Sequence, residues 1–156
     1  MASVSVRGQI LEAVKARLET ITLANGYLTG VQKVYFDKIP MGLDLAAYHL
    51  PAIFLIDGPD SLEFEHACVK GNWDLRLQLW HNEVGDIDMI HFVRDVLKAL
   101  YADSAVATVN DKFRSLHPSI VELIPATISP DLHMIDANRV SELTFIVRYR
   151  TKLFSM

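Results

Sequence analysis

The side chains best suited to chemistry in this chain are six histidines, and their spacing does not form a metal site. They occur singly, at His49, His66, His81, His91, His117 and His133. A zinc site needs ligands at close spacing, such as two histidines on one helix face. His66 instead lies near Phe64 and Cys68 in an alternating segment, so we expect it to be buried or half-buried in a strand. The sequence leaves open whether His117 or His133 meets a carboxylate.

Cys68 is the only cysteine, and its context does not favour a nucleophile. A reactive thiolate is stabilised by a helix N-terminus or a cationic neighbour. Cys68 instead falls within an expected strand, on the apolar side of the alternation. We therefore expect it to pack as a small hydrophobic residue. A single cysteine also excludes an intrachain disulfide, which fits a reducing compartment.

Glycines and acidic residues do not predict a cofactor site. The seven glycines occur singly, whereas a phosphate-binding loop needs several of them just before a helix. The acidic residues Asp57, Asp60, Glu63 and Glu65 lack the spacing of a calcium loop. The segment Asp57-Gly58-Pro59-Asp60 is typical of a turn. We therefore expect no cofactor, no metal and no enzymatic activity.

Basic residues gather near Arg148 without the aromatic partners of a nucleic-acid site. Arg148 and Arg150 fall on one face of an expected strand, and Tyr149 falls on the other. A single-stranded nucleic acid would need aromatic side chains on the basic face for stacking. Acidic residues outnumber basic ones by 19 to 15, and this net charge of -4 argues against duplex binding. We favour an exposed strand face or an intersubunit salt-bridge surface.

Two amphipathic segments are predicted to form helices. From Ser5 to Ala24 apolar residues recur at helical spacing, and Asn25-Gly26 is typical of a helix end. The second helix is expected from Asp86 to Tyr101. Its expected apolar stripe consists of Ile87, Ile90, Val93 or Val96, Leu97 and Leu100.

The remaining pattern predicts six strands, at about 31–36, 52–56, 62–68, 73–79, 119–128 and 140–150. Val69-Lys70-Gly71-Asn72 is expected to turn a hairpin, in which Glu63 and Glu65 could pair with Arg76. Together the elements predict an α+β fold: a mainly antiparallel sheet with two principal helices packed on it, in the order α-β-β-β-β-α-β-β. The residues expected to share its core include Val14, Leu18, Phe54, Leu77, Leu97 and Phe145.

Residues 1–156 are expected to form a single domain. The length is typical of one domain, and no linker or repeat divides the chain. Apolar residues at 51% and charged residues at 22% are ordinary for a globular protein. The start does not resemble a secretory signal, and the longest apolar run, Ala52 to Ile56, is too short to cross a bilayer. We expect a soluble intracellular product without a membrane partner.

Two long segments, Asp37 to Leu50 and Ser129 to Asn138, are expected to be irregular loops. Both mix apolar with polar residues, although a loop that only connects strands is usually short and polar. The helices and strands already supply enough apolar side chains for one core. The apolar loop residues are therefore predicted to contact another subunit or a partner, and the candidates are Met41, Leu43, Leu132 and Met134.

Three parts of the chain occur in the same order in one known family. Ile10-Leu11-Glu12-Ala13-Val14-Lys15-Ala16-Arg17-Leu18, continuing to Asn25-Gly26-Tyr27, resembles its opening helix and exit. Leu50-Pro51-Ala52-Ile53-Phe54-Leu55-Ile56-Asp57-Gly58 resembles its central strand after a long first loop. A wide hairpin, the helix from Asp86 to Tyr101 and a long closing strand match the rest. Over nearly the whole chain, the sequence resembles the bacteriophage tail-terminator and tail-completion (minor tail) proteins.

This resemblance implies a structural virion protein, a tail terminator that forms a ring of six subunits. The ring would cap the tail tube and provide the joint to the head. Its partners would be further copies of itself, the tail tube protein and a head or neck connector protein. The protein would be made in the host cytoplasm and would lie at the tail end nearest the head. DNA would pass through the lumen without specific binding, for which an acidic protein is suited.

Two other functions are compatible with the sequence. One is a different neck component, such as a head-completion protein. The other is a small α+β ligand-binding or enzymatic domain with its site in the segment from Asp37 to Leu50. A ring former should be a large assembly or a monomer ready to assemble. A small enzyme should be a monomer or dimer with a defined pocket.

Overall fold

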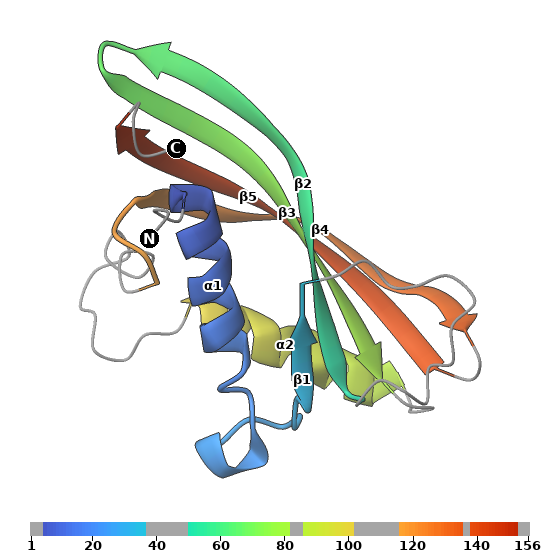
Figure 1. The fold of residues 1–156 in the computed structure, drawn as a ribbon. Helices are drawn as coiled ribbons and strands as arrows, with labels where there is room; N and C mark the ends of the chain where they lie inside the picture. Colours follow the sequence, from blue (N-terminus) through green and yellow to red (C-terminus); the bar gives the residue numbers. More distant parts are fainter. Residues whose placement is uncertain (1–4, 37–49, 82–85, 102–115, 136–137, 153–156) are drawn as a thin grey trace.

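A five-stranded sheet with two helices against one of its faces forms the frame of the structure (Figure 1). The computed structural model describes residues 5–36, 50–81, 86–101, 116–135 and 138–152. The elements are α1 (Val6–Leu18), η1 (Leu23–Asn25), β1 (Lys33–Tyr35), β2 (Ala52–Glu65), β3 (Cys68–His81), α2 (Asp86–Tyr101), β4 (Ile120–Ile135) and β5 (Asn138–Lys152).

The strands lie in the order β1-β2-β3-β5-β4. All neighbouring strands are antiparallel except β1 and β2, which are parallel. The predicted α+β class, the mainly antiparallel sheet and the succession of helices and strands are confirmed. The two strands expected at 52–56 and 62–68 form one continuous strand, β2.

Helix α1 is shorter than predicted because its C-terminal residues make local bonds of their own. The Ser5 side chain caps the start by accepting a hydrogen bond from the Gly8 N–H at 3.1 Å. After Leu18, the Thr20 hydroxyl donates to the Arg17 carbonyl. Thr22 then caps the separate turn η1, and Gly26 ends that turn in the left-handed conformation at φ 86°. The predicted helical segment from 19 to 24 is therefore a linked pair of turns.

The segment Asp57-Gly58-Pro59-Asp60 was expected to be a turn, and this prediction was wrong. It is a bulge inside β2, where the pairing with β3 shifts register between Asp57 and Asp60. A bulge accommodates Pro59, whose ring nitrogen has no hydrogen to donate to a ladder. Gly58 passes so close to Asp74 on β3 that an added Cβ would collide with its backbone carbonyl.

The hairpin between β2 and β3 turns earlier than predicted. The last pair is Glu65 with Cys68, so the turn lies at 66–67, where His66 has φ 55°. The expected turn at Val69-Lys70-Gly71-Asn72 lies inside β3. Gly71 is needed there for a different reason, because an added Cβ would overlap the ring of Tyr149.

Strands β3 and β5 follow the predicted alternation. Leu75 and Leu77 on β3 and Leu143 and Phe145 on β5 are all buried. Leu75 lies opposite Phe145, and Leu77 lies opposite Leu143. These two central strands therefore supply the buried side chains at the centre of the core.

Strand β4 replaces the irregular loop that was expected from Ser129 to Asn138. It continues through Pro125 and Pro130 to Ile135, and β5 begins at Asn138. Its pairing with β5 shifts register in three places. Pro125 borders one of these shifts and Pro130 lies within another, and irregular positions of an edge strand are where a missing N–H is tolerated.

The predicted single core is divided between the two faces of the sheet. Both helices pack with Leu77, Phe145 and their neighbours in one large cluster, which includes Val14 and Leu18 and has Leu97 at its margin. Phe54 was predicted to join this core, and that was wrong. Its side chain lies on the opposite face, in a smaller cluster with Ala52, Trp80 and Val140. Adjacent residues of β2 point to opposite faces, so its solid apolar run feeds both clusters.

Helix α2 has the predicted bounds, and its predicted stripe is buried only in its C-terminal part, where Val96 and Leu100 lie in the core and Leu97 packs against it. Its buried apolar residues are Met89, Phe92, Val96, Ala99 and Leu100. Ile87 and Ile90 were expected in the core, yet they are 66% and 63% exposed. Asp95, with 0% exposure, accepts hydrogen bonds from the backbone N–H groups of Leu28 and Thr29 at 2.9 and 2.7 Å. These two hydrogen bonds fix the rotation of α2 about its axis relative to the segment that follows η1.

Candidate assembly surfaces

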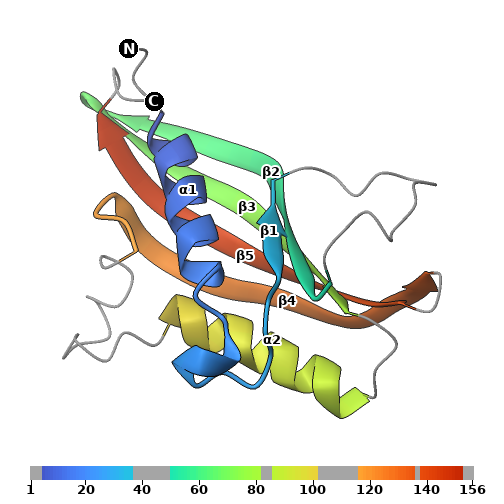
Figure 2. The same ribbon diagram turned by 60° about the horizontal axis from the view of Figure 1, so that its bottom comes forward.

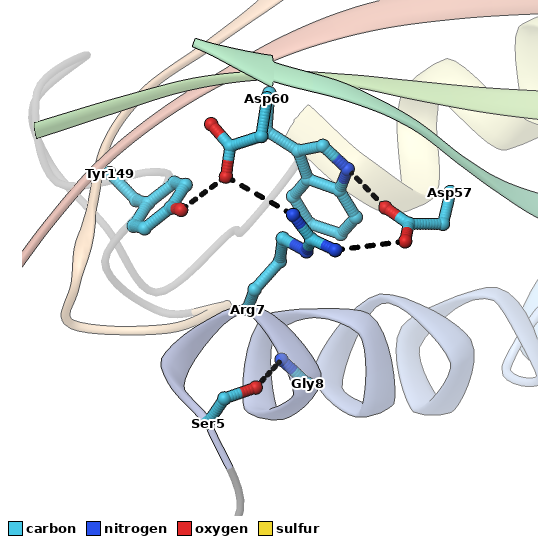
Figure 3. Close-up of polar contacts among 7 residues, drawn as sticks. Ser5, Arg7, Gly8, Asp57, Asp60 and Tyr149 are labelled. Carbon is cyan, nitrogen blue, oxygen red and sulfur yellow. Dashed lines mark hydrogen bonds and ion pairs between the residues drawn. The ribbon is translucent and has the colours of Figure 1, made fainter. Parts of the chain in front are cut away.

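A polar cluster joins the start of α1 to the bulge of β2 (Figure 3). The Arg7 guanidinium donates to the Asp57 carboxylate at 3.0 Å and to the Asp60 carboxylate at 3.4 Å. Asp57 also accepts from the Trp73 indole N–H at 2.7 Å, and Arg7 lies over the Trp73 ring at 5.6 Å. Tyr149 donates its hydroxyl hydrogen to Asp60. One cation and two carboxylates thus tie α1, β2, β3 and β5 together.

This cluster is suited to fixing the positions of α1 and the three strands relative to one another. The Asp60 side chain is only 6% exposed, so its charge needs the bonds that Arg7 and Tyr149 provide. Burial and the hydrogen bond to Asp60 both raise the pKa of Tyr149 above its usual range, so the phenol stays protonated and keeps donating. Three of the four acidic residues considered as a hard-cation site, Asp57, Asp60 and Glu65, therefore bind groups of their own chain. Among the described residues, no three His, Cys, Asp or Glu side chains gather as metal ligands.

Beyond this cluster, the β2–β3 hairpin projects from the body of the molecule (Figures 1 and 2). We call residues 60–72 of this hairpin the arm. On the arm, Leu62 is 42% exposed and Phe64 is 65% exposed. Phe64 lies opposite Val69 and Leu62 opposite Gly71, so both side chains occupy the same face of the arm. We call this pair the arm patch.

The other face of the arm is charged. Lys70 forms an ion pair with Glu65, which lowers the pKa of that carboxyl. Arg148 donates to Glu122 at 2.9 Å and to Asn72 at 3.1 Å. Glu65 therefore pairs with Lys70, whereas Arg76 had been expected, because the register sets Arg76 opposite Ile56. A shallow hollow of about 290 Å³ on this face is lined by residues that include Glu63, Lys70, Arg148 and Arg150.

A second exposed apolar pair lies on α2. Ile87 and Ile90 point outward, and helical spacing places the exposed Arg94 and Lys98 along the same side. We call these four residues the α2 stripe. Lys98 also lies over the ring of Tyr27 at 5.1 Å. The stripe is thus apolar in its first half and basic in its second.

Three described histidines, His66, His81 and His117, and the cysteine occupy ordinary structural positions. His66 was expected to be buried or half-buried in a strand, but it is exposed at the hairpin turn. Cys68 is half-buried at the first position of β3, less enclosed than expected. The His117 ring bonds to the Gln9 side chain at 3.1 Å and accepts from the Ser119 N–H. Burial lowers the pKa of His81, whose ring meets Phe92 edge-on.

The four partner residues predicted from the sequence are only partly placed. Met41 and Leu43 lie outside the described residues. Leu132 and Met134 belong to β4, and Met134 pairs in register with Arg139. The arm patch and the α2 stripe were not predicted. An available signal was Phe92, because a stripe through this large apolar residue turns Ile87 and Ile90 outward.

Comparisons with known proteins identify a shared fold. No family model matches the chain. No curated protein matches it either. Among solved structures, the chain is similar to one from the virion of a native gene transfer agent (GTA) particle. The TM-score is 0.51 at 13% identity, over 94% of this chain and 96% of that one. Within the described residues, no helix has both the length and the apolar character needed to cross a membrane. At this identity the likeness shows that the two chains share a fold.

Proposed function

We propose that this chain is a structural protein of a virion, and specifically a tail terminator. In this role, six copies form a ring that caps the tail tube and provides the joint to the head. The observation that supports the proposal most is the fold likeness to a virion chain along nearly the full length of both chains. The succession of opening helix, wide hairpin, second helix and long closing strands agrees with the resemblance in the sequence.

The described surface suits assembly. Eight large apolar side chains in the described part of the chain are exposed, among them the arm patch and the outward pair on α2. Exposed apolar side chains that gather into patches mark contacts with other proteins. The enclosed carboxylates of Asp60 and Asp95, and the exposed carboxylate of Asp57, each accept hydrogen bonds from groups of the same chain. We propose that the protein has a structural role and no enzymatic activity.

The mechanism of such a protein is geometric. One side of the ring would match the last ring of the tail tube, so the terminator can bind there. The other side would present a different surface to a connector of the head or neck, so tube subunits could no longer add. The net charge of -4 would favour passage of DNA without adhesion. The protein would lie in the virion at the tail end nearest the head.

The proposal is tested by imaging particles made with and without this chain. Without it, we expect tails of abnormal length and heads that remain unjoined. The purified chain, or its assembled form, should appear as a ring of six subunits. Tails of normal length that lack only their heads would identify a head-completion or neck protein instead. Complete and infectious particles without the chain would refute a role in the virion.

The partner residues predicted from the sequence are tested in the same way. We propose that Met41, Leu43, Leu132 and Met134 help form intersubunit or tube-facing surfaces. The variants Leu43→Asp and Met134→Asp should stay folded but fail to form rings or to cap tails. Unchanged assembly would contradict the assignment. Unfolding would instead place these side chains in the core.

A further inference from the structure

The arm patch and the α2 stripe lie at opposite ends of the molecule. In both ribbon views the tip of the β2–β3 hairpin and the first turns of α2 are far apart (Figures 1 and 2). Each end exposes two large apolar side chains: Leu62 and Phe64 on the arm, Ile87 and Ile90 on α2. A ring of identical subunits needs two different surfaces on each chain, because each subunit contacts one neighbour with one surface and the next with the other.

The charges that lie next to the two patches along the chain and have no ion pair to a described residue are opposite in sign. On the arm, Glu63 and Glu65 flank Phe64, and Glu63 is exposed without an ion pair to any described residue. On α2, Arg94 continues the stripe one turn after Ile90, and it also has no ion pair within the described chain. Glu65 is already paired with Lys70, so Glu63 beside one apolar patch and Arg94 beside the other, both unpaired among the described residues, are the charges that favour pairing between the two.

The same charges disfavour each patch pairing with itself. Two arms paired edge to edge would bring Glu63 close to its own copy, and like charges opposite each other destabilise strand pairs. Two α2 stripes packed on each other would gather four cations, Arg94 and Lys98 of each copy, in one interface with no acidic partner from the stripe. Charge thus selects the mixed contact over either symmetric one.

The strand geometry allows both rows of the arm to take part. β1 pairs only with Ala52, Ile53 and Phe54, so within the described chain the outer edge of β2 has no neighbouring strand along the arm. A partner that approaches this edge can meet the apolar row on one side and the acidic row on the other. The arm is also held at a fixed angle, because Arg7 and Tyr149 secure the bulge at its base.

We propose that the arm of one copy docks on the α2 stripe of the next copy. Leu62 and Phe64 pack on Ile87 and Ile90, and Glu63 lies near Arg94. This inference rests on the proposed ring function, to which it adds the pair of surfaces that join neighbouring subunits. It commits to a second copy of this chain as the occupant of both patches.

Two variants with one defective surface each provide the test. Phe64→Asp removes the arm patch, and Ile90→Asp removes the stripe. Both side chains are exposed, so each variant should keep the circular dichroism spectrum and cooperative unfolding of a folded chain. Each variant alone should be monomeric by native mass spectrometry and sedimentation. Mixed in equal amounts, they should form dimers and nothing larger, because only one intact arm and one intact stripe can meet.

Charge reversal supplies the second measurement. Glu63→Arg and Arg94→Glu should each weaken association by roughly tenfold or more, and the double variant should recover most of that loss. Leu23→Asp is the matched control, because Leu23 is 68% exposed but belongs to neither surface. This control should assemble like the wild type.

The outcomes separate this inference from the proposed function. If the wild type forms rings and either single variant still does, the arm–stripe contact is wrong and the ring stands. Variants that stay monomeric after mixing would also overturn the contact. If the wild type forms no ring, alone or in particles, both the proposed function and this inference fail.

Discussion

Replacing Asp95 by alanine should destabilise the fold more than any surface change on α2. Asp95 is completely buried, and one of its carboxylate oxygens accepts the backbone N–H groups of Leu28 and Thr29 at 2.9 and 2.7 Å. Hydrogen bonds to a charged group contribute about 1.5 to 3 kcal/mol each, and a buried donor left without a partner adds a desolvation cost. The two bonds share one oxygen, so we do not add them fully and expect a loss of about 3 kcal/mol. The higher helix propensity of alanine offsets roughly 0.5 kcal/mol of this.

Urea unfolding followed by circular dichroism measures this loss directly. With a slope of about 2 kcal/mol per molar, typical of a domain of this size, the midpoint should fall by more than about 1 M. All variants are compared at one protein concentration, because assembly would otherwise change the apparent stability. Asp95→Asn is the informative partner, because its amide oxygen can still accept from Leu28 and Thr29, and it should lose about half as much. Glu12→Ala, on the exposed side of α1, is the control and should change the free energy of unfolding by less than about 0.5 kcal/mol.

Two results would refute this reasoning. If Asp95→Ala unfolds at the same urea concentration as the wild type, the bonds to the segment after η1 contribute nothing to stability. If Asp95→Asn is as damaging as Asp95→Ala, the carboxylate charge matters rather than its geometry as an acceptor.

Three further predictions concern the core, one close approach and one titrating group. Leu77→Ala and Phe145→Ala each remove a fully buried side chain from the centre of the sheet and should cost about 2–5 kcal/mol in urea unfolding. Gly71→Ala should lower the melting temperature by several degrees, because the new Cβ overlaps the ring of Tyr149; a neutral result would show that the ring can move aside. Burial lowers the pKa of His81 below its usual 6.5, so the unfolded chain binds more protons, and stability should fall as the pH drops below about 6.5. His81→Gln should flatten that part of the stability–pH curve, and an unchanged slope would contradict the assignment.

The sequence predicts those parts of the fold that depend on local alternation. Leu75 and Leu77 of β3, and Leu143 and Phe145 of β5, alternate with polar residues, and this period of two decides both the strand and its buried face. The bounds of α2 follow equally well from its helical pattern. In these elements a residue's neighbours along the chain contain the necessary information.

The predictions that failed depend on contacts between distant residues. Asp57-Gly58-Pro59-Asp60 has the composition of a turn and of a bulge alike. The bulge is selected by Arg7, about fifty positions away, and by the backbone of Asp74. Gly71 was assigned to a turn because glycine is common in turns. Its actual role, packing against the ring of Tyr149, is a tertiary contact that the sequence alone does not show.

On helix α2, the prediction that Ile87 and Ile90 are buried failed for a related reason. The helix offers two apolar stripes, one through Ile87 and Ile90 and another through Met89, Phe92 and Val96. The bonds from Leu28 and Thr29 to Asp95 orient the helix and thereby choose the second stripe. A single sequence shows no pairing between Asp95 and the segment that it binds. The arm patch and the α2 stripe could not be predicted for the same reason, because the exposure of a side chain depends on which elements pack against it.

The strand order has a consequence for synthesis of the chain. β5 lies between β3 and β4, although it is the last of the described strands to be made. At typical rates of about 5–20 residues per second, β3 waits roughly 4 to 14 s for its second neighbour after it leaves the ribosome. During that time one edge of the β2–β3 hairpin is open to nascent chains on neighbouring ribosomes. Folding can then be completed only when β5 inserts into the middle of the sheet, so this protein should fold after translation and slowly for its size.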